Sequence, residues 1–334
     1  MKFKNIDNWK TEIKKRAAEK NIKPTDMQQR YILEEFASKI SHSQYKDSMI
    51  LKGGFIVSNL LGIDNRTTRD IDLTFNSTIY SEDEIRTILT DVASVCDDSF
   101  FDYEIHSVKE CQVDDGYSGF SATIHAISGK TKLPLKLDIS NNTLVYPQAI
   151  ENRFQSMFFE DNIQVMSYSI ENIIAEKFET TLDRGEFNTR MRDLFDIALL
   201  METQTHLIDD ILLADCIIEV SKERGTLSNL FNFNEIVLDL QESEIFNKNF
   251  DSYKKKRYPN SSLVLRDVFD VFNQIQDYVE LYLGMDEKTP FNEQISRAKE
   301  KQLKNPSPKS SKSRKKKENG KEIASPGKEY DTGR

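Results

Sequence analysis

Two aspartates separated by one apolar residue, in Asp70-Ile71-Asp72, have the spacing in this chain that points most directly to chemistry. In an extended strand successive side chains point to opposite faces, so Asp70 and Asp72 would share one face while Ile71 enters the core. Two neighbouring carboxylates repel each other, and a cation between them relieves that repulsion. Hard oxygen ligands suit Mg²⁺, with Mn²⁺ as the other possible ion. The pair therefore predicts a magnesium site.

A glycine pair and a third acid add to this prediction. Gly53 and Gly54 open a predicted helix, where backbone N–H groups can hold anionic phosphates. Asp138 lies on a predicted strand over 133–140 whose other face is formed by Leu and Ile, so it can act as a metal ligand or as a general base. Three acids beside a glycine turn are the parts of a two-metal phosphoryl-transfer site.

The second half of the chain supplies two further candidates. Lys177 borders the apolar stripe of a predicted helix over 169–184, so it either reaches water or meets a buried anion such as a triphosphate. Asp193 and Asp196 are three residues apart and share a helix face. The alternative interpretation of these two acids is a helix-start pair that offsets the macrodipole.

Apolar periodicity predicts strands in the first half of the chain and helices in the second, an α+β arrangement. Strands are expected at 48–52, 70–75, 101–108, 119–127 and 133–140. Helices are expected at 8–20, 25–42, 54–61, after the capping box Ser81-Glu82-Asp83-Glu84, and at 169–184, 191–203, 208–224, 235–256, 263–283 and 290–304.

Composition divides the chain into three regions. We predict a domain over 1–160, a helical domain over 161–303, and a basic disordered tail over 304–334 that has almost no apolar side chains. The tail carries a net charge of +6, so the preceding residues sum to −15. An acidic body argues against an extended nucleic-acid surface, although the tail or a local groove could supply one.

Composition also excludes several classes of protein. No apolar run approaches the roughly 18 residues of a membrane span, and no secretory signal is recognised at the start. Cys96, Cys111 and Cys216 are too scattered for a disulfide framework or a zinc site. We therefore expect a cytoplasmic protein with no membrane partner and no disulfide partner.

Four blocks occur together in one order: SKISHSQYKDSMILKGG, TRDIDL, LKLDIS and the AEK to NTRMRDLFDI segment. In this order the chain resembles the AbiEii/AbiGii toxin family of nucleotidyltransferases, from type IV toxin–antitoxin and phage abortive-infection systems. The resemblance covers roughly residues 8–203. It implies a polymerase-beta-like nucleotidyltransferase domain, a mixed sheet flanked by helices, followed by an all-helical C-terminal domain.

The resemblance also implies roles for single residues. It makes metal ligands of Asp70, Asp72 and Asp138, and adds Lys177 and Asp193 to the catalytic set. The nucleotide-binding candidates are Lys52, Gly53, Gly54, Ser58, Thr68, Lys177 and Arg192. One departure concerns Phe55, which follows the glycine pair where many nucleotidyltransferases have Ser or Thr. Ser58, one turn later, is the candidate replacement for that hydroxyl.

The expected activity follows from the same resemblance. It is transfer of a nucleoside monophosphate from an NTP (GTP or a pyrimidine NTP), with Mg²⁺, to an RNA acceptor such as a tRNA 3′ end. A cognate antitoxin encoded alongside is implied as a partner. Two alternatives stay open: a GTP- or NTP-binding toxin or interaction module without turnover, and a transferase that acts on protein or a small molecule.

Overall fold

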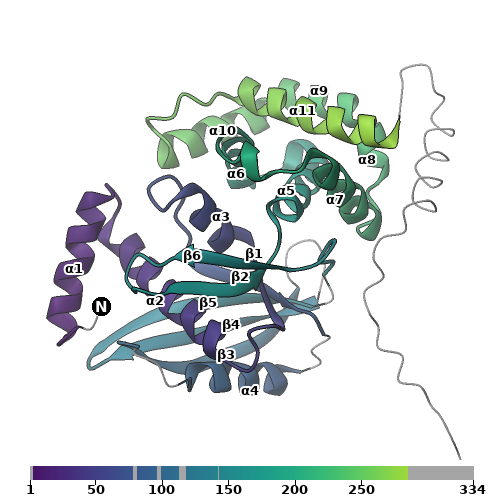
Figure 1. The fold of residues 1–334 in the computed structure, drawn as a ribbon. Helices are drawn as coiled ribbons and strands as arrows, with labels where there is room; N and C mark the ends of the chain where they lie inside the picture. Colours follow the sequence, from purple (N-terminus) through teal and green to yellow (C-terminus); the bar gives the residue numbers. More distant parts are fainter. Residues whose placement is uncertain (1–2, 78–80, 96–98, 113–117, 142, 285–334) are drawn as a thin grey trace, which may run out of the picture.

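The computed structural model describes residues 3–77, 81–95, 99–112, 118–141 and 143–284 (Figure 1). The expected helix at 290–304 and the tail lie outside these residues. Strands of the described part form one seven-stranded mixed sheet in the order β3-β4-β5-β2-β1-β7-β6. Their bounds are β1 Met49–Lys52, β2 Asp70–Phe75, β3 Asp102–Gln112, β4 Ser118–Ser128, β5 Thr131–Ser140, β6 Ile150–Gln155 and β7 Asn162–Ser167.

Four helices precede or interrupt the strands, and the rest follow them. The first four are α1 Ile6–Glu19, α2 Pro24–His42, α3 Gly53–Leu61 and α4 Glu82–Ala93. The later helices are α5 Ile170–Arg184, α6 Met191–Thr203, α7 Asp210–Glu223, α8 Ser228–Phe231, α9 Phe233–Glu242, α10 Glu244–Arg257 and α11 Leu265–Leu283. None of the helices in the described part is both long and apolar enough to cross a membrane.

Local sequence explains where several helices begin. The Asn5 side chain accepts hydrogen bonds from the first backbone N–H groups of α1, and Ser81 and Ser169 do the same for α4 and α5. Pro24 opens α2, because its missing N–H would have no partner in the first turn. These start signals are the reason that the expected helices are found close to their predicted bounds.

The α+β class and the mixed sheet are confirmed, but several details differ from the prediction, among them the short helix α8, where no helix is expected. β6 gave no strand pattern because Phe154 is its only buried side chain. β7 was overlooked although Ile163 and Val165 alternate with more exposed residues. The helix expected over 235–256 is two helices, because Ser243 is extended and caps α10 through the N–H of Phe246.

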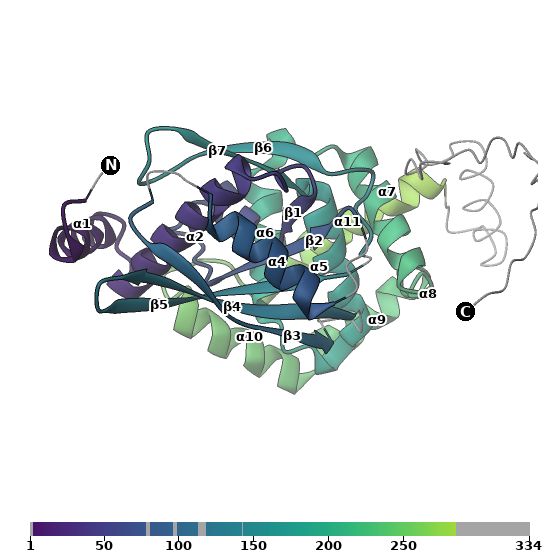
Figure 2. The ribbon, with the colours of Figure 1, turned by 90° about the horizontal axis from the view of Figure 1, so that it is seen from below.

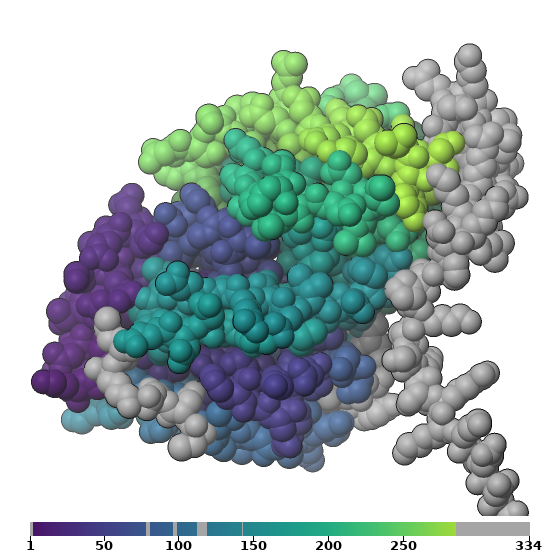
Figure 3. Space-filling model, in the orientation of Figure 1, coloured from purple at the N-terminus to yellow at the C-terminus, as the bar shows by residue number. Residues whose placement is uncertain are grey.

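The molecule is built in layers. Helices α2 and α4 lie against one side of the sheet, and α5 to α11 form a helical layer over the other side (Figures 1 and 2). The space-filling view shows this helical layer, in green, directly against the layer that contains the sheet (Figure 3). Within the helical layer the Phe178 ring of α5 packs against Phe233 and Phe272, with ring centroids 6.0 and 5.1 Å apart.

A buried ion pair joins the two layers. Arg66, in the loop between α3 and β2, donates from Nε to Asp196 Oδ1 of α6 at 3.0 Å and from Nη2 to Oδ2 at 3.3 Å. The two side chains are 3% and 0% exposed. Lys177 Nζ lies 3.0 Å from the same Asp196 Oδ2, so one carboxylate receives two cations from different elements. Removing Arg66 would leave the buried Asp196 with one cation, which Asp193 shares, in place of two, and this loss of compensation is destabilising.

The Arg66→Met variant tests this link. Methionine keeps much of the length but removes the charge and the fork of donors, so the free energy of unfolding in urea should fall by about 3 to 5 kcal/mol. Arg266→Met is the matched control, since its pair with Asp270 is 4.0 Å long and both side chains are largely exposed. That control should change stability very little. Equal small effects in both variants would show that the buried pair does not join the layers.

Candidate active site

Three neighbouring strands place charged residues at one level of the sheet. Lys52 of β1 pairs with Asp72 of β2, and Asp72 pairs with Asp138 of the parallel strand β5. Paired residues point to the same face, and adjacent strands lie about 4.8 Å apart. Asp70 is two residues before Asp72 and shares its face, whereas Ile71 is fully buried on the other side. The carboxylates therefore form a row that faces the helical layer.

Few donors neutralise this row. Asp70 accepts from the Thr68 hydroxyl at 2.9 Å, and Asp72 accepts from the backbone N–H of Gly54 at 3.2 Å. Asp138 accepts from Lys136 Nζ at 2.7 Å and from the Ser121 hydroxyl at 3.0 Å. Across the described residues neither Asp70 nor Asp72 forms an ion pair.

The electrostatic cost concentrates on Asp72. Burial, together with the charges of Asp70 and Asp138, raises the pKa of this carboxyl from 3.8 to about 6, although the Gly54 N–H and Lys52 partly oppose the shift. A group in this position favours either a proton or a bound cation.

The glycine pair is explained by how closely α3 approaches this acid. Gly53 has φ +62°, and a Cβ there would lie 2.3 Å from Asp72 Oδ2. A Cβ on Gly54 would lie 2.8 Å from the Thr68 hydroxyl oxygen. Only residues without a side chain allow the first N–H groups of α3 to lie beside the carboxylate row. The start of α3 is thus open to an anion bound above the acids.

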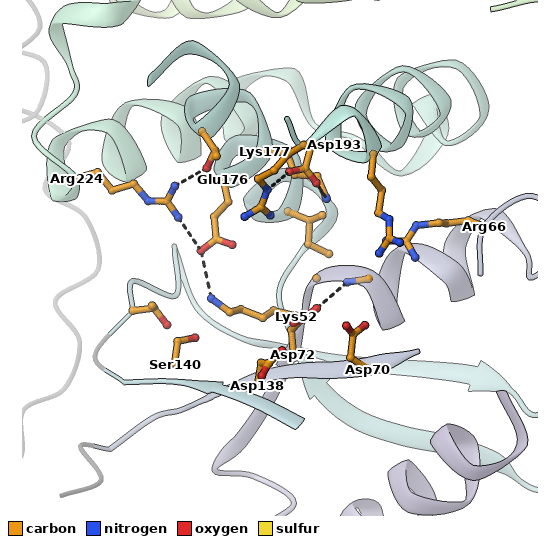
Figure 4. Close-up of a pocket in the computed structure, with 17 residues that line it drawn as sticks. Lys52, Arg66, Asp70, Asp72, Asp138, Ser140, Glu176, Lys177, Asp193 and Arg224 are labelled. Atoms are coloured by element: carbon orange, nitrogen blue, oxygen red, sulfur yellow. Dashed lines mark hydrogen bonds and ion pairs between the residues drawn. The ribbon is translucent and has the colours of Figure 1, made fainter. Parts of the chain in front are cut away.

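A cavity of about 360 Å³ lies between the row and the helical layer. Figure 4 shows Asp70, Asp72 and Asp138 along the sheet side, with Lys177, Asp193 and Arg224 on helices opposite. The cationic side chains that line the cavity are Lys52, Arg66, Lys177, Arg190, Arg192 and Arg224. The acidic row therefore faces a helical wall in which basic side chains lie beside two further acids, Glu176 and Asp193.

Two of the cations above the row, Lys177 and Arg190, are held by acids of α6. Lys177 contacts Asp193 and Asp196, and Arg190 Nε donates to Asp193 Oδ2 at 2.6 Å. Burial alone would lower the pKa of Lys177, but the two aspartates outweigh it and raise the pKa. Burial would raise the pKa of Asp193, yet Lys177 and Arg190 hold it at about 2. These groups stay ionised, so Lys177 neither reaches water nor lacks an anion.

A second series of ion-paired side chains crosses the cavity beside Lys52. Glu176 Oε1 lies 3.7 Å from Lys52 Nζ and 3.6 Å from Arg224 Nη2, so one carboxylate of α5 links β1 to the end of α7 (Figure 4). Arg224 also pairs with Glu179. Four residues that line the cavity are not among those expected from the sequence: Glu176, Arg224, Arg66 and Arg190. Glu176 directly precedes Lys177 and could have been found from that position, whereas Arg224 gives no local signal.

The structure brings together most of the residues singled out from the sequence. Those that line the cavity are Lys52, Gly53, Gly54, Asp70, Asp72, Asp138, Lys177, Arg192 and Asp193. Thr68 does not line it and contacts Asp70 instead. Ser58 requires a correction, because its hydroxyl is buried, donates to the Arg66 carbonyl at 2.6 Å and accepts from Arg30. Phe55 is buried in the core against Phe154, with centroids 5.5 Å apart.

No preformed metal cage is found. In the part of the chain that the structure describes, no group of three or more His, Cys, Asp or Glu side chains is already arranged to hold a metal ion. The acidic row nevertheless consists only of oxygen donors, which is the ligand type of Mg²⁺ and Mn²⁺.

An acidic row on a mixed sheet, a helix start beside it and cations opposite define the class of protein: an enzyme that handles phosphorylated nucleotides. The family model described as the nucleotidyl transferase AbiEii toxin of type IV toxin–antitoxin systems matches residues 36–278. The chain therefore belongs to the AbiEii family and is a nucleotidyltransferase. The family expected from the four sequence blocks is confirmed.

Solved structures give weaker likenesses. A candidate nucleotidyltransferase from H. pylori is 16% identical, with a TM-score of 0.43 over 80% of this chain and 100% of its own. JHP933 from Helicobacter pylori is 17% identical, with a TM-score of 0.42 over 77% and 93%. An antigenic nucleotidyltransferase-like protein from Paracoccidioides brasiliensis is 19% identical, with a TM-score of 0.30 over 58% and 91%. No curated protein matches the chain.

A pair of glycine variants tests the close approach of α3. Gly53→Ala and Gly129→Ala both place a side chain at positive φ, +62° and +59°, and each should lose about 1 to 2 kcal/mol from that strain. Only the Gly53 variant also meets Asp72, so its unfolding free energy should fall by at least about 1 kcal/mol more. Nothing lies within 4 Å of a Cβ at Gly129. Equal losses, measured by urea unfolding, would contradict a contact that requires glycine.

The raised pKa of Asp72 predicts a pH-dependent stability. The pKa of Asp72 in the folded protein, about 6, exceeds its ordinary value of 3.8, so folding takes up a proton between pH 3.8 and pH 6. Above pH 6 the carboxyl is ionised in the folded protein, and its charge destabilises the fold. Without divalent cation, Asp72→Asn should therefore stabilise the protein at pH 7.5 by up to about 3 kcal/mol. The gain should vanish as the pH falls to 4. A loss of stability at pH 7.5 would show that the ionised carboxylate supports the fold.

Proposed function

We propose that this nucleotidyltransferase moves a nucleoside monophosphate from an NTP to an RNA acceptor, the 3′ end of a tRNA, in a reaction that depends on Mg²⁺. The observation that carries the proposal is one cavity with an acidic row on its sheet side and lysine and arginine side chains around that row. A triphosphate needs both, because its metal ions bind carboxylates while its oxygens are balanced by cations.

The acidic row supports the use of a divalent cation. Asp70, Asp72 and Asp138 would hold it, since they share one face and Asp72 is destabilised as an isolated anion. When bound there, Mg²⁺ (or Mn²⁺) would supply positive charge that stabilises the phosphates and the attacking and leaving oxygens of the nucleotidyl transfer.

The chain's own groups would orient the two substrates. The N–H groups at the start of α3 would bind the triphosphate, helped by Lys52 and Arg192 at the cavity wall. The RNA 3′ hydroxyl forms a bond to the α-phosphorus, the bond to the β-phosphate oxygen breaks, and pyrophosphate leaves. Asp138 would accept the hydroxyl proton, and Lys136 beside it would stabilise the carboxylate before transfer.

Lys177 and Asp193 have a positioning role in this proposal. Their mutual pairing, together with Arg190, fixes the helical wall of the cavity. The ammonium group of Lys177 is already paired with aspartates, so this residue would contribute positive electrostatic potential to the cavity. The nucleotide would be GTP or a pyrimidine NTP, and the protein would act in the cytoplasm opposite a cognate antitoxin, which is the partner that its family implies.

Labelled nucleotides test the function. Purified protein with each α-labelled NTP, Mg²⁺ and total RNA should label RNA at tRNA size. Asp70→Asn and Asp72→Asn should reduce labelling by about a thousandfold or more and remove toxicity on expression, while the protein stays folded. Asp161→Asn, at an exposed aspartate in the turn before β7, is the control and should retain activity.

The destination of the label separates the alternatives. Label in protein or in a small molecule would replace the RNA acceptor and keep the transferase. NTP binding without any transfer, combined with toxicity that survives Asp70→Asn, would favour a binding module and would overturn the proposal.

A further inference from the structure

The last turn of α10 carries an uninterrupted basic run, Lys254-Lys255-Lys256-Arg257. It is the longest such run before residue 304, in a stretch of chain whose net charge is −15. Lys255, Lys256 and Arg257 are exposed and Lys254 is half-buried. We call these four residues the α10 basic turn.

The α10 basic turn lacks carboxylate partners. Among the described residues, none of its four side chains forms an ion pair. One or two cations are enough to offset the dipole at a helix end. Four adjacent like charges repel one another, and an anion bound from outside relieves that repulsion.

Aromatic packing ties the turn to the helix that carries part of the active site. Tyr253 and Tyr258 flank the run, and both rings contact Phe195 of α6, with centroids 5.4 and 4.7 Å apart. The Tyr258 ring is nearly parallel to Phe195, at 6°. In the sequence, Phe195 lies between Asp193, which lines the cavity, and Asp196 of the buried ion pair. These contacts hold the end of α10, and with it the α10 basic turn, against α6.

The turn lies outside the cavity, and the residue that follows it, Tyr258, is close to charged groups of the cavity. The charges of Asp196, Arg66 and Arg192 all act on the Tyr258 hydroxyl, and Arg66 and Arg192 line the cavity. Figure 2 shows α10 along the outer edge of the molecule. No side chain of the turn lines the cavity. An NTP held in the cavity therefore uses the acids and the start of α3, and the turn is left for a longer polyanion.

We propose that the α10 basic turn binds the phosphodiester backbone of the RNA acceptor while the RNA 3′ end enters the cavity, with Arg192 between the two. This inference rests on the proposed function for the identity of the polyanion. Contacts of this kind are made to phosphates, so they position the acceptor without reading its sequence, and they weaken as salt increases.

The test is RNA binding by the full chain, with bulk tRNA as the probe and no NTP present. Lys255→Gln/Lys256→Gln removes two exposed charges and keeps residues that suit a helix. Lys14→Gln/Lys15→Gln is the matched control, an adjacent exposed pair on α1. The α10 variant should bind tRNA roughly tenfold or more weakly at 0.1 M salt. The slope of log K against log salt should shrink by about 1.4 to 1.8.

The control variant should bind tRNA like the unaltered protein, and both variants should bind NTP within twofold of it. If the α10 variant keeps both the affinity and the salt slope, or if the unaltered protein does not bind tRNA, the inference is overturned. These outcomes are separate from failure of the proposed function, which is read from transfer of label. If the protein labels RNA but the α10 variant binds tRNA normally, the proposed function stands and the proposed role of the α10 basic turn is wrong.

Discussion

Repulsion among three carboxylates on one face of the sheet is the constraint on which the rest of the site depends. Most of the electrostatic cost of this repulsion falls on Asp72, because this residue is buried beside Asp70 and is paired with Asp138 in the neighbouring strand. The chain supplies partial relief from the Gly54 N–H and from Lys52 in the next strand. Each of these is an electrostatic response to the same row, and together they leave it short of positive charge, which is the condition under which a cation or a triphosphate–cation complex binds best.

The acids on the two sides of the cavity differ in how they are compensated. Asp193 and Asp196 are buried and carry Lys177, Arg190 and Arg66 as partners, so their charges are balanced within the protein. The acids of the sheet have hydroxyl or N–H donors, and Lys136 is the single cation paired with them among the described residues. Internally balanced acids serve packing and orientation, whereas poorly balanced ones are available to a ligand. We therefore expect local charge balance, rather than proximity to the cavity, to distinguish supporting acids from those available to a ligand.

The sequence allowed the sheet side of the site to be predicted better than the helical side. Strand alternation specifies which side chains share a face, so Asp70, Asp72 and Asp138 could be placed together before their contacts were known. Arg66 and Asp196 are 130 residues apart, and no local pattern reports such a pair. Ser58 is expected at the nucleotide only because it lies one turn after Phe55, where the family resemblance implies a hydroxyl, and its sequence position does not show that the hydroxyl is buried against Arg66 and Arg30. β6 was missed because an edge strand with one buried residue has no period to detect.

The position of Phe55 has a consequence for how the site tolerates change. Its ring packs on Phe154 in the core, so the side chain after the glycine pair contributes nothing to the cavity. The donors at the start of α3 belong to the main chain, and no exchange of one side chain for another on that helix can delete an N–H group, proline excepted. Residues along α3 can therefore vary to suit the core while the donor set persists. Loss of these donors would require a change in backbone path, and the two glycines are the positions at which a substitution would cause one.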